Sequence, residues 1–120
     1  MKSQLSLIGQ HALLDLYGIN PVVACDTVVI EEILLHAAQL VGATVLNSYF
    51  HSFGENQGVT GVLLLSESHI SIHTWPEHGF AAVDLFMCGD VLLKKAADYL
   101  IDALQATSYQ WQQMNRGHQV

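Results

Sequence analysis

The spacing of apolar residues predicts two amphipathic helices. Asp26 or Thr27 can cap the first helix, which ends at Gly42, and Asp90 can cap the second. In both segments apolar residues recur every three or four positions, which is the spacing of one helix face. These residues are Ile30, Ile33, Leu34, Ala37 and Val41 in the first segment, and Leu93, Ala96, Ala97, Leu100, Ile101 and Leu104 in the second.

Charged residues fit the same two helices. We expect Glu31 and Glu32 in the first turn of the first helix, where the helix dipole favours negative charge. Lys94 and Asp98 are four residues apart on the polar side of the second helix, so we expect them to pair at its surface.

Six shorter apolar segments predict β-strands. The turn sequence Gly18-Ile19-Asn20-Pro21 ends the first strand, and the short loops 54–58 and 75–79 each join two strands into a hairpin. We therefore predict one α+β domain over residues 1–120, a two-layer sandwich of a largely antiparallel β-sheet with two helices on one face. The predicted strands are 11–18, 43–53, 59–67, 69–74, 80–88 and 108–114.

The composition predicts an oligomer and argues against several partners. Hydrophobic residues make up 51% of the chain and charged residues 12%, so we expect another subunit to cover an apolar face. Four Lys and Arg against eleven Asp and Glu give a net charge of −7, which disfavours nucleic acid. No segment is apolar over a membrane-spanning length, and the N-terminus does not resemble a signal peptide. We place the protein in the cytoplasm, where Cys25 and Cys88 stay reduced.

The apolar strand that begins at Val59 leads directly into the polar sequence Ser66-Glu67-Ser68-His69. In a straight strand over 59–74, Ser68 and His73 would lie on opposite faces, because side chains alternate along a strand. The two residues can cooperate only if the chain bends near Glu67 and Ser68.

Three conventional interpretations of this stretch remain open. Ser68, His73 and Asp84 would form a hydrolase triad, although the Gly-x-Ser-x-Gly sequence is missing. The same polar residues could simply be hydrogen-bonded within a β-bulge. A metal site is disfavoured, because residues four apart in a strand are about 13 Å apart at Cα. Its ligands would be His51, His69, His73 and His78.

A fourth interpretation is self-cleavage at the Glu67–Ser68 bond. A serine hydroxyl can attack the carbonyl that precedes it when the backbone there is strained, which converts the amide to an ester. Elimination from that ester leaves a dehydroalanine, which hydrolyses to a pyruvoyl group at the new N-terminus. Such a group forms a Schiff base with a substrate amine and accepts the electrons that decarboxylation releases, as pyridoxal phosphate does elsewhere. No external cofactor is then needed.

The sequence SESHISIHTWPEHGFAAVDLFMCG resembles the signature of the prokaryotic S-adenosylmethionine decarboxylases, small pyruvoyl enzymes of polyamine synthesis. The resemblance extends over GQHALLDLYG, GATVLNSYFHSF and GVTGVLLLSE, and so covers about residues 9–104. It implies a proenzyme that cleaves itself and then converts S-adenosylmethionine to decarboxylated S-adenosylmethionine and CO2. The product would donate an aminopropyl group in spermidine synthesis.

The resemblance also implies roles for the residues of self-cleavage. Ser68 would become the pyruvoyl group, and cleavage after Glu67 would leave a β chain of residues 1–67 and an α chain of residues 68–120. His73 would assist by acid-base chemistry, to which an imidazole is suited near neutral pH. Thr60 lies where the family usually has a serine that contributes a hydroxyl to cleavage.

Further roles follow for the decarboxylation itself. Cys88 would return a proton to the substrate, since a thiol keeps its proton near neutral pH. Phe53 and Trp75 match aromatic residues that hold adenine, and Glu77 matches the acceptor for the ribose hydroxyls. The resemblance implies no metal and a homodimer with its site between two protomers, so that Phe53 would serve the neighbouring subunit.

Three departures from the family pattern leave alternatives open. The family commonly has Gly-Arg-His where this chain has Gly9-Gln10-His11, and Thr-Cys-Gly where it has Met87-Cys88-Gly89, and the loop 54–58 is one residue longer. A pyruvoyl-dependent ornithine or arginine decarboxylase is the alternative enzyme, although adenine and ribose contacts favour the nucleoside substrate. An unprocessed regulatory homologue is the alternative outside enzymes.

Overall fold

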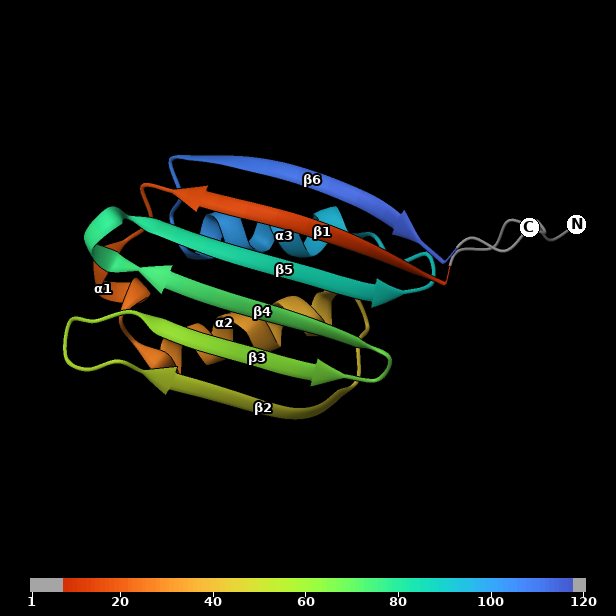
Figure 1. The fold of residues 1–120 in the computed structure, drawn as a ribbon, viewed down its shortest axis with the longest axis horizontal. Helices are drawn as coiled ribbons and strands as arrows, with labels where there is room; N and C mark the ends of the chain where they lie inside the picture. The colour runs from red at the N-terminus through yellow and green to blue at the C-terminus, as the bar shows by residue number, and fades with distance from the viewer. Residues whose placement is uncertain (1–7, 118–120) are drawn as a thin grey trace, which may run out of the picture.

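The computed structural model describes residues 8–117, which form one six-stranded β-sheet with helices against one face (Figure 1). All neighbouring strands are antiparallel, and their order across the sheet is β2-β3-β4-β5-β1-β6. The strands are β1 (Gly9–Tyr17), β2 (Val45–Ser52), β3 (Val59–Leu65), β4 (Ser68–Trp75), β5 (Phe80–Cys88) and β6 (Ser108–Arg116).

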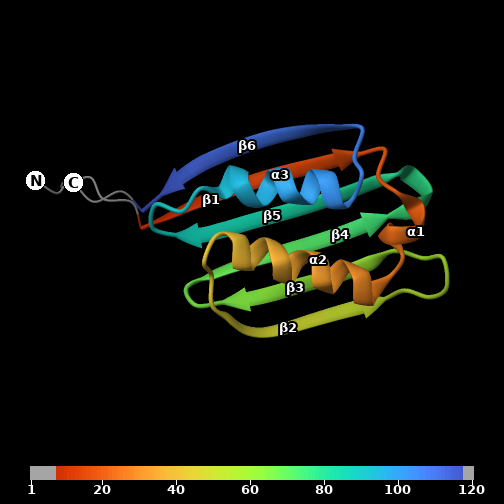
Figure 2. The same ribbon diagram turned by 180° about the vertical axis from the view of Figure 1, so that it is seen from behind.

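Helices α2 (Thr27–Leu40) and α3 (Leu93–Ala103) lie side by side on the same face of the sheet (Figure 2). Two single-turn elements, α1 (Pro21–Ala24) and η1 (Pro76–His78), lie together at one end of the sheet. The predicted α+β sandwich with two helices on one face is therefore confirmed. Within residues 8–117, no helix is both long enough and apolar enough to span a membrane.

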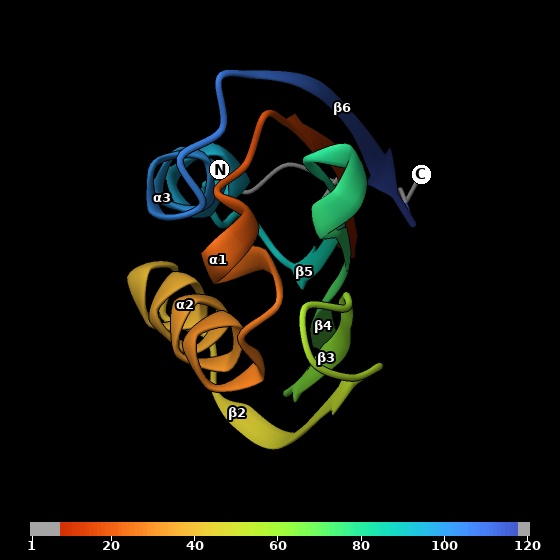
Figure 3. The same cartoon turned by 90° about the vertical axis from the view of Figure 1, so that its left-hand side faces the viewer.

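The core lies between the two long helices and the sheet face that they cover. Buried and more exposed residues alternate along the strands, so one set of side chains faces the helices and the other faces away. In β1, for example, Leu14 and Leu16 are fully buried, whereas Leu13 between Ala12 and Leu14 is 45% exposed. No described element covers the opposite face of the sheet, here called the open face (Figure 3).

The helix boundaries confirm one predicted cap and correct two other expectations. Asp26 caps α2, because its carboxylate accepts hydrogen bonds from the backbone N–H groups of Val28 and Val29. Glu31 and Glu32 lie beyond the first turn of α2, since the helix already begins at Thr27. Asp90 does not cap α3.

The residue before α3 is Leu92, which makes no side-chain capping bond. Gly89 has a φ of 76° and forms a turn with Asp90 directly after β5, so the chain has to reach the helix layer before α3 can start. The expected pair on the surface of α3 is present, with Lys94 Nζ 3.2 Å from an oxygen of Asp98.

A tight hairpin joins β3 to β4 through Ser66 and Glu67. Leu65 pairs with Ser68 across it, so the chain reverses within two residues instead of continuing as a straight strand. Glu67 has a φ of 61°, in the left-handed region that side chains other than glycine rarely adopt. The bend expected near Glu67 and Ser68 is thus a complete reversal.

Candidate active site

Ser68 and Cys88 lie together at one end of the sheet. Ser68 is the first residue of β4, and its Oγ accepts a hydrogen bond of 3.1 Å from the backbone N–H of Cys88, the last residue of β5. Ser66, Ser68 and Cys88 line a pocket of about 220 Å³, together with Val91 from the connection to α3. A hydroxyl, a thiol and the hairpin turn therefore share one small pocket.

The peptide between Glu67 and Ser68 lies under local strain. Holding a side chain such as that of Glu67 in the left-handed region costs about 1–2 kcal/mol. The turn cannot relax freely, because the N–H of Ser66 is bonded to the carbonyl of Thr44 at 2.9 Å and Ser68 is held by Cys88. A residue in a strained backbone conformation directly before an anchored hydroxyl fits the precursor of a pyruvoyl group.

A second group of predicted residues lies at the other end of β4, on the open face. Thr60 and His73 are opposite each other in β3 and β4, with Thr60 Oγ1 3.0 Å from His73 Nδ1. Trp75 follows on the same face, with its ring centroid 6.2 Å from that of His73 and 5.4 Å from that of Phe80. The hydroxyl and the imidazole are therefore hydrogen-bonded, next to exposed aromatic rings.

The adenine and ribose candidates are also at this end. Phe53 follows β2, is 61% exposed, and packs edge to face with His51 at 4.8 Å between ring centroids. His51 is opposite Thr60 in the sheet, which links this aromatic pair to the Thr60–His73 pair. Glu77 is exposed within η1.

The two groups do not meet within one chain. Ser68 and His73 are five residues apart along β4, or about 16 Å at the usual strand rise. They also point to opposite faces, because Ser68 is on the same face as the buried Ile70 and Ile72, whereas His73 is on the open face. Asp84 is opposite Ser71 in β5, so the hydrolase trio is not assembled either.

The metal interpretation finds no support in the geometry. Among the residues that the structure describes, no group of three or more His, Cys, Asp or Glu side chains is arranged to hold an ion. His69 and His73 share the open face of β4 at the separation expected for a strand.

Comparisons with known proteins agree with the fold and the motif. A sequence model of the S-adenosylmethionine decarboxylase family matches residues 10–117. The chain belongs to the S-adenosylmethionine decarboxylase family.

Curated relatives are named S-adenosylmethionine decarboxylase proenzyme. One from Parasynechococcus marenigrum is 50% identical over 101 residues, covering 83% of this chain and 78% of the relative. Another from Thermodesulfovibrio yellowstonii is 40% identical over 111 residues, covering 92% of this chain and 82% of the relative. The crystal structure of the adenosylmethionine decarboxylase from Aquifex aeolicus matches with a TM-score of 0.85 and 39% identity, covering 93% of this chain and 92% of that one.

Family membership confirms the function predicted from the sequence at the level of the enzyme class, a decarboxylase. It favours S-adenosylmethionine over the ornithine or arginine alternative, since the relatives are named S-adenosylmethionine decarboxylase proenzyme. The individual residue roles stay predictions, which the geometry above locates.

Sequence reasoning did not group the polar residues on the open face near the Ser68 end, although it named His69 as a candidate metal ligand and Asp84 as a candidate triad member. His69 and His11 both pack against Phe86, at 5.9 and 5.8 Å between ring centroids. Burial lowers the pKa of His69, and the neighbouring His11 lowers it further, while Asp84 opposes both. Arg116 lies over Phe86 at 5.6 Å. These residues come from β4, β1, β5 and β6, so no local sequence spacing could have grouped them.

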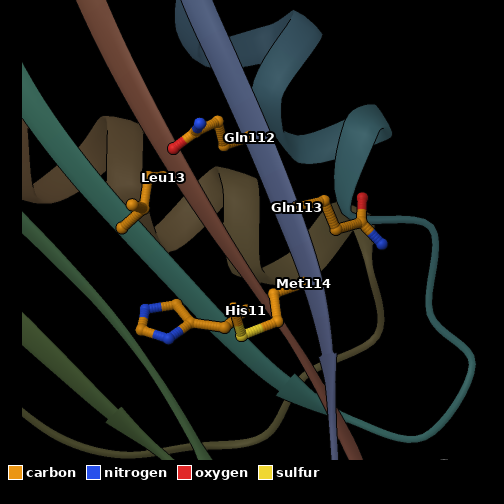
Figure 4. A pocket seen from close by; sticks show the side chains of 5 residues that line it. All are labelled: His11, Leu13, Gln112, Gln113 and Met114. Atoms are coloured by element: carbon orange, nitrogen blue, oxygen red, sulfur yellow. The ribbon is translucent and has the colours of Figure 1, made fainter.

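His11 also opens onto a second hollow in the structure. With Leu13, Gln112, Gln113 and Met114 it lines a pocket of about 360 Å³ along β1 and β6 (Figure 4). Its Nε2 is buried without a hydrogen bond, 3.8 Å from an oxygen of Asp84.

Proposed function

We propose that this protein is a self-processing decarboxylase that converts S-adenosylmethionine to decarboxylated S-adenosylmethionine and CO2, the aminopropyl donor of spermidine synthesis. The family supplies the reaction class. The structural observation that carries the proposal is the junction of Glu67, Ser68 and Cys88, where a hydroxyl and a thiol share one pocket directly after a residue in the left-handed region.

In this proposal Ser68 Oγ attacks the carbonyl carbon of Glu67, and the amide becomes an ester. Elimination then releases the Glu67 carboxylate and leaves a dehydroalanine, and water replaces its nitrogen, which departs as ammonia. The products are a β chain of residues 1–67 and an α chain of residues 68–120 that begins with a pyruvoyl group. Relief of the left-handed conformation at Glu67 favours cleavage, and the Cys88 N–H holds the hydroxyl in place.

The pyruvoyl group supplies an electron sink for decarboxylation. In this proposal Cys88 returns a proton to the substrate α-carbon. Its nearness to Ser68 supports this role, since its backbone N–H bonds to Ser68 Oγ in the uncleaved chain. The free thiol needed for this step suits a reducing compartment, so we place the reaction in the cytoplasm.

We further propose that the complete site forms between two copies of the chain. Thr60, His73 and Trp75 lie on the open face, far from the Ser68 junction of their own chain. The open face carries large apolar side chains that no described element covers: Leu13, Tyr49, Leu64 and Met114 are 45%, 66%, 50% and 65% exposed. A second copy packed on this face would cover them, and we propose that the His73 end of one sheet then lies over the hairpin end of the other, where Ser68 follows the turn at Glu67.

In this dimer the substrate would extend from the Ser68 junction of one chain towards the residues on the open face of the other chain. Phe53 and Trp75 offer aromatic faces to adenine and to the sulfonium cation, and Glu77 offers a carboxylate to the ribose hydroxyls. An ornithine or arginine molecule has no adenine or ribose for these three residues to contact. The net charge of −7 also suits a substrate that carries a cationic sulfur.

Two measurements on the purified protein test this function. A denaturing intact-mass spectrum should show two fragments that meet between Glu67 and Ser68, with a ketone in place of the amino group on the C-terminal fragment. Decarboxylation assays with S-adenosylmethionine, ornithine and arginine should show preference for the first. A single full-length mass would favour the regulatory homologue, and preference for ornithine or arginine would overturn the substrate assignment.

A further inference from the structure

Gln10 is a buried polar residue whose side-chain amide uses both of its N–H donors and its oxygen in hydrogen bonds. It is only 8% exposed and lies on β1, on the side that faces the helices. Its Nε2 donates to the carbonyl of Gly89 at 2.8 Å and to the carbonyl of Val91 at 3.0 Å. Its Oε1 accepts from Nε2 of Gln113. The two N–H donors of the amide are thus both committed to one backbone segment.

That segment is the connection which follows Cys88 and leads to α3. Side chains of the connection itself make no cap at the start of α3, and Asp90 is exposed. The N–H of Gly89 also bonds to the carbonyl of Ile8, so residues on both sides of Gly9 hold the connection. Val91 in turn lines the pocket that contains Ser68 and Cys88.

Gln113 completes the arrangement from the edge strand β6. Its side chain points away from His11, Leu13 and Gln112, which lie on the open face (Figure 4). The contact with Gln10 fixes which end of the Gln10 amide faces the connection, because only the amide oxygen can accept from Gln113.

We propose that Gln10 is a positioning residue for Cys88. This rests on the proposed role of Cys88 as proton donor beside the Ser68-derived group. By binding the two carbonyls that follow Cys88, the Gln10 amide sets where the Cys88 backbone and thiol lie relative to Ser68. The residues proposed to bind adenine and ribose are at the other end of the sheet. Loss of the two hydrogen bonds from Gln10 therefore lowers turnover without weakening substrate binding.

Three substitutions at position 10 separate positioning from packing. Gln10→Met keeps a similar length but removes both donors, and Gln10→Glu replaces the donors with a carboxylate that faces two carbonyl oxygens. Gln10→Arg keeps several N–H donors for the same carbonyls. Gln39→Met, on the exposed side of α2, is the matched control for loss of a glutamine.

Each variant is purified as the processed enzyme, and the cleaved fraction from intact mass normalises the turnover number. We expect Gln10→Met and Gln10→Glu to lower kcat by about 10- to 100-fold with KM for S-adenosylmethionine changed by less than about 3-fold. Gln10→Arg and Gln39→Met should keep kcat within about 3-fold of wild type. Alkylation by iodoacetamide, followed by mass spectrometry, should show Cys88 reacting faster in Gln10→Met, relative to Cys25 in the same chain.

The proposal is overturned if Gln10→Met and Gln10→Glu keep wild-type kcat per cleaved chain, or if they lower the melting temperature while kcat and Cys88 alkylation stay unchanged. If neither variant folds, the Arg variant decides: a 10-fold or greater loss of kcat in folded, cleaved Gln10→Arg, with unchanged KM, contradicts donor-based positioning. The experiment also distinguishes a failure of the proposed proton-donor role of Cys88. In that case Cys88→Ala would keep full turnover, while the alkylation rate of Cys88 would still show whether Gln10 positions it.

Discussion

Coexpression of a Ser68→Ala chain with a His73→Ala chain tests whether the site is shared between two copies. Within one chain these residues are about 16 Å apart along β4 and point to opposite faces of the sheet. No rearrangement that preserves β4 brings them together. Each variant alone should be folded and uncleaved, because every one of its junctions lacks either the serine or the imidazole.

The mixture should recover a definite part of the activity. With equal amounts and random pairing, about half of the dimers contain one copy of each variant. In such a dimer one junction combines Ser68 of the His73→Ala chain with His73 of the Ser68→Ala chain. The other junction lacks both residues. About half of the chains that carry Ser68 are then cleaved, and total decarboxylation reaches about one quarter of the wild-type value.

The assay uses two affinity tags, which isolate the hybrid dimers and distinguish the two chains by mass. A matched control pairs Ser68→Ala with Cys88→Ala. Ser68 and Cys88 are in contact within one chain, so this hybrid should contain cleaved chains but show no recovered turnover. Isolated hybrid dimers of the first pair that remain uncleaved would refute the shared site. Activity recovered in the control would instead refute the assignment of Ser68 and Cys88 to the same chain.

Three further predictions concern single chains. Cys88→Ala should still cleave but lose about 100-fold or more in turnover, and an uncleaved Cys88→Ala protein, seen by intact mass, would contradict the division of roles between Ser68 and Cys88. Asp26→Ala should lower the free energy of unfolding by about 1 kcal/mol in urea titrations, because two backbone N–H groups lose their cap; an unchanged midpoint would contradict the capping role. The pKa of His69 is lowered by burial, so the unfolded chain binds a proton more readily than the folded one, and stability should fall as the pH drops through the ordinary histidine range. His69→Gln should show a weaker loss of stability over that range, and an identical pH dependence would count against this cause.

Much of the fold could be predicted because its long elements carry local periodicity. The six strands and two long helices lie within a few residues of their expected positions, and Asp26 has the local hydrogen bonds of a cap. The short elements α1 and η1 were missed, since three or four residues show no period. Asp90 failed as a cap because it lies in the turn after β5, and the chain has to reach the helix layer before α3 can start.

The sequence by itself determined the chemistry: a serine after a glutamate at the end of an apolar strand, a thiol at the end of a later strand, and an imidazole five residues beyond the serine. Only the tertiary structure decided which of these groups can meet. Strand alternation places Ser68 and His73 on opposite faces, while the pairing of β4 with β5 brings Cys88 to Ser68. The insertion of β1 between β5 and β6 brings Gln10 beneath the connection after Cys88. Contacts of this kind depend on the order and register of strands distant in sequence, which local periodicity does not encode.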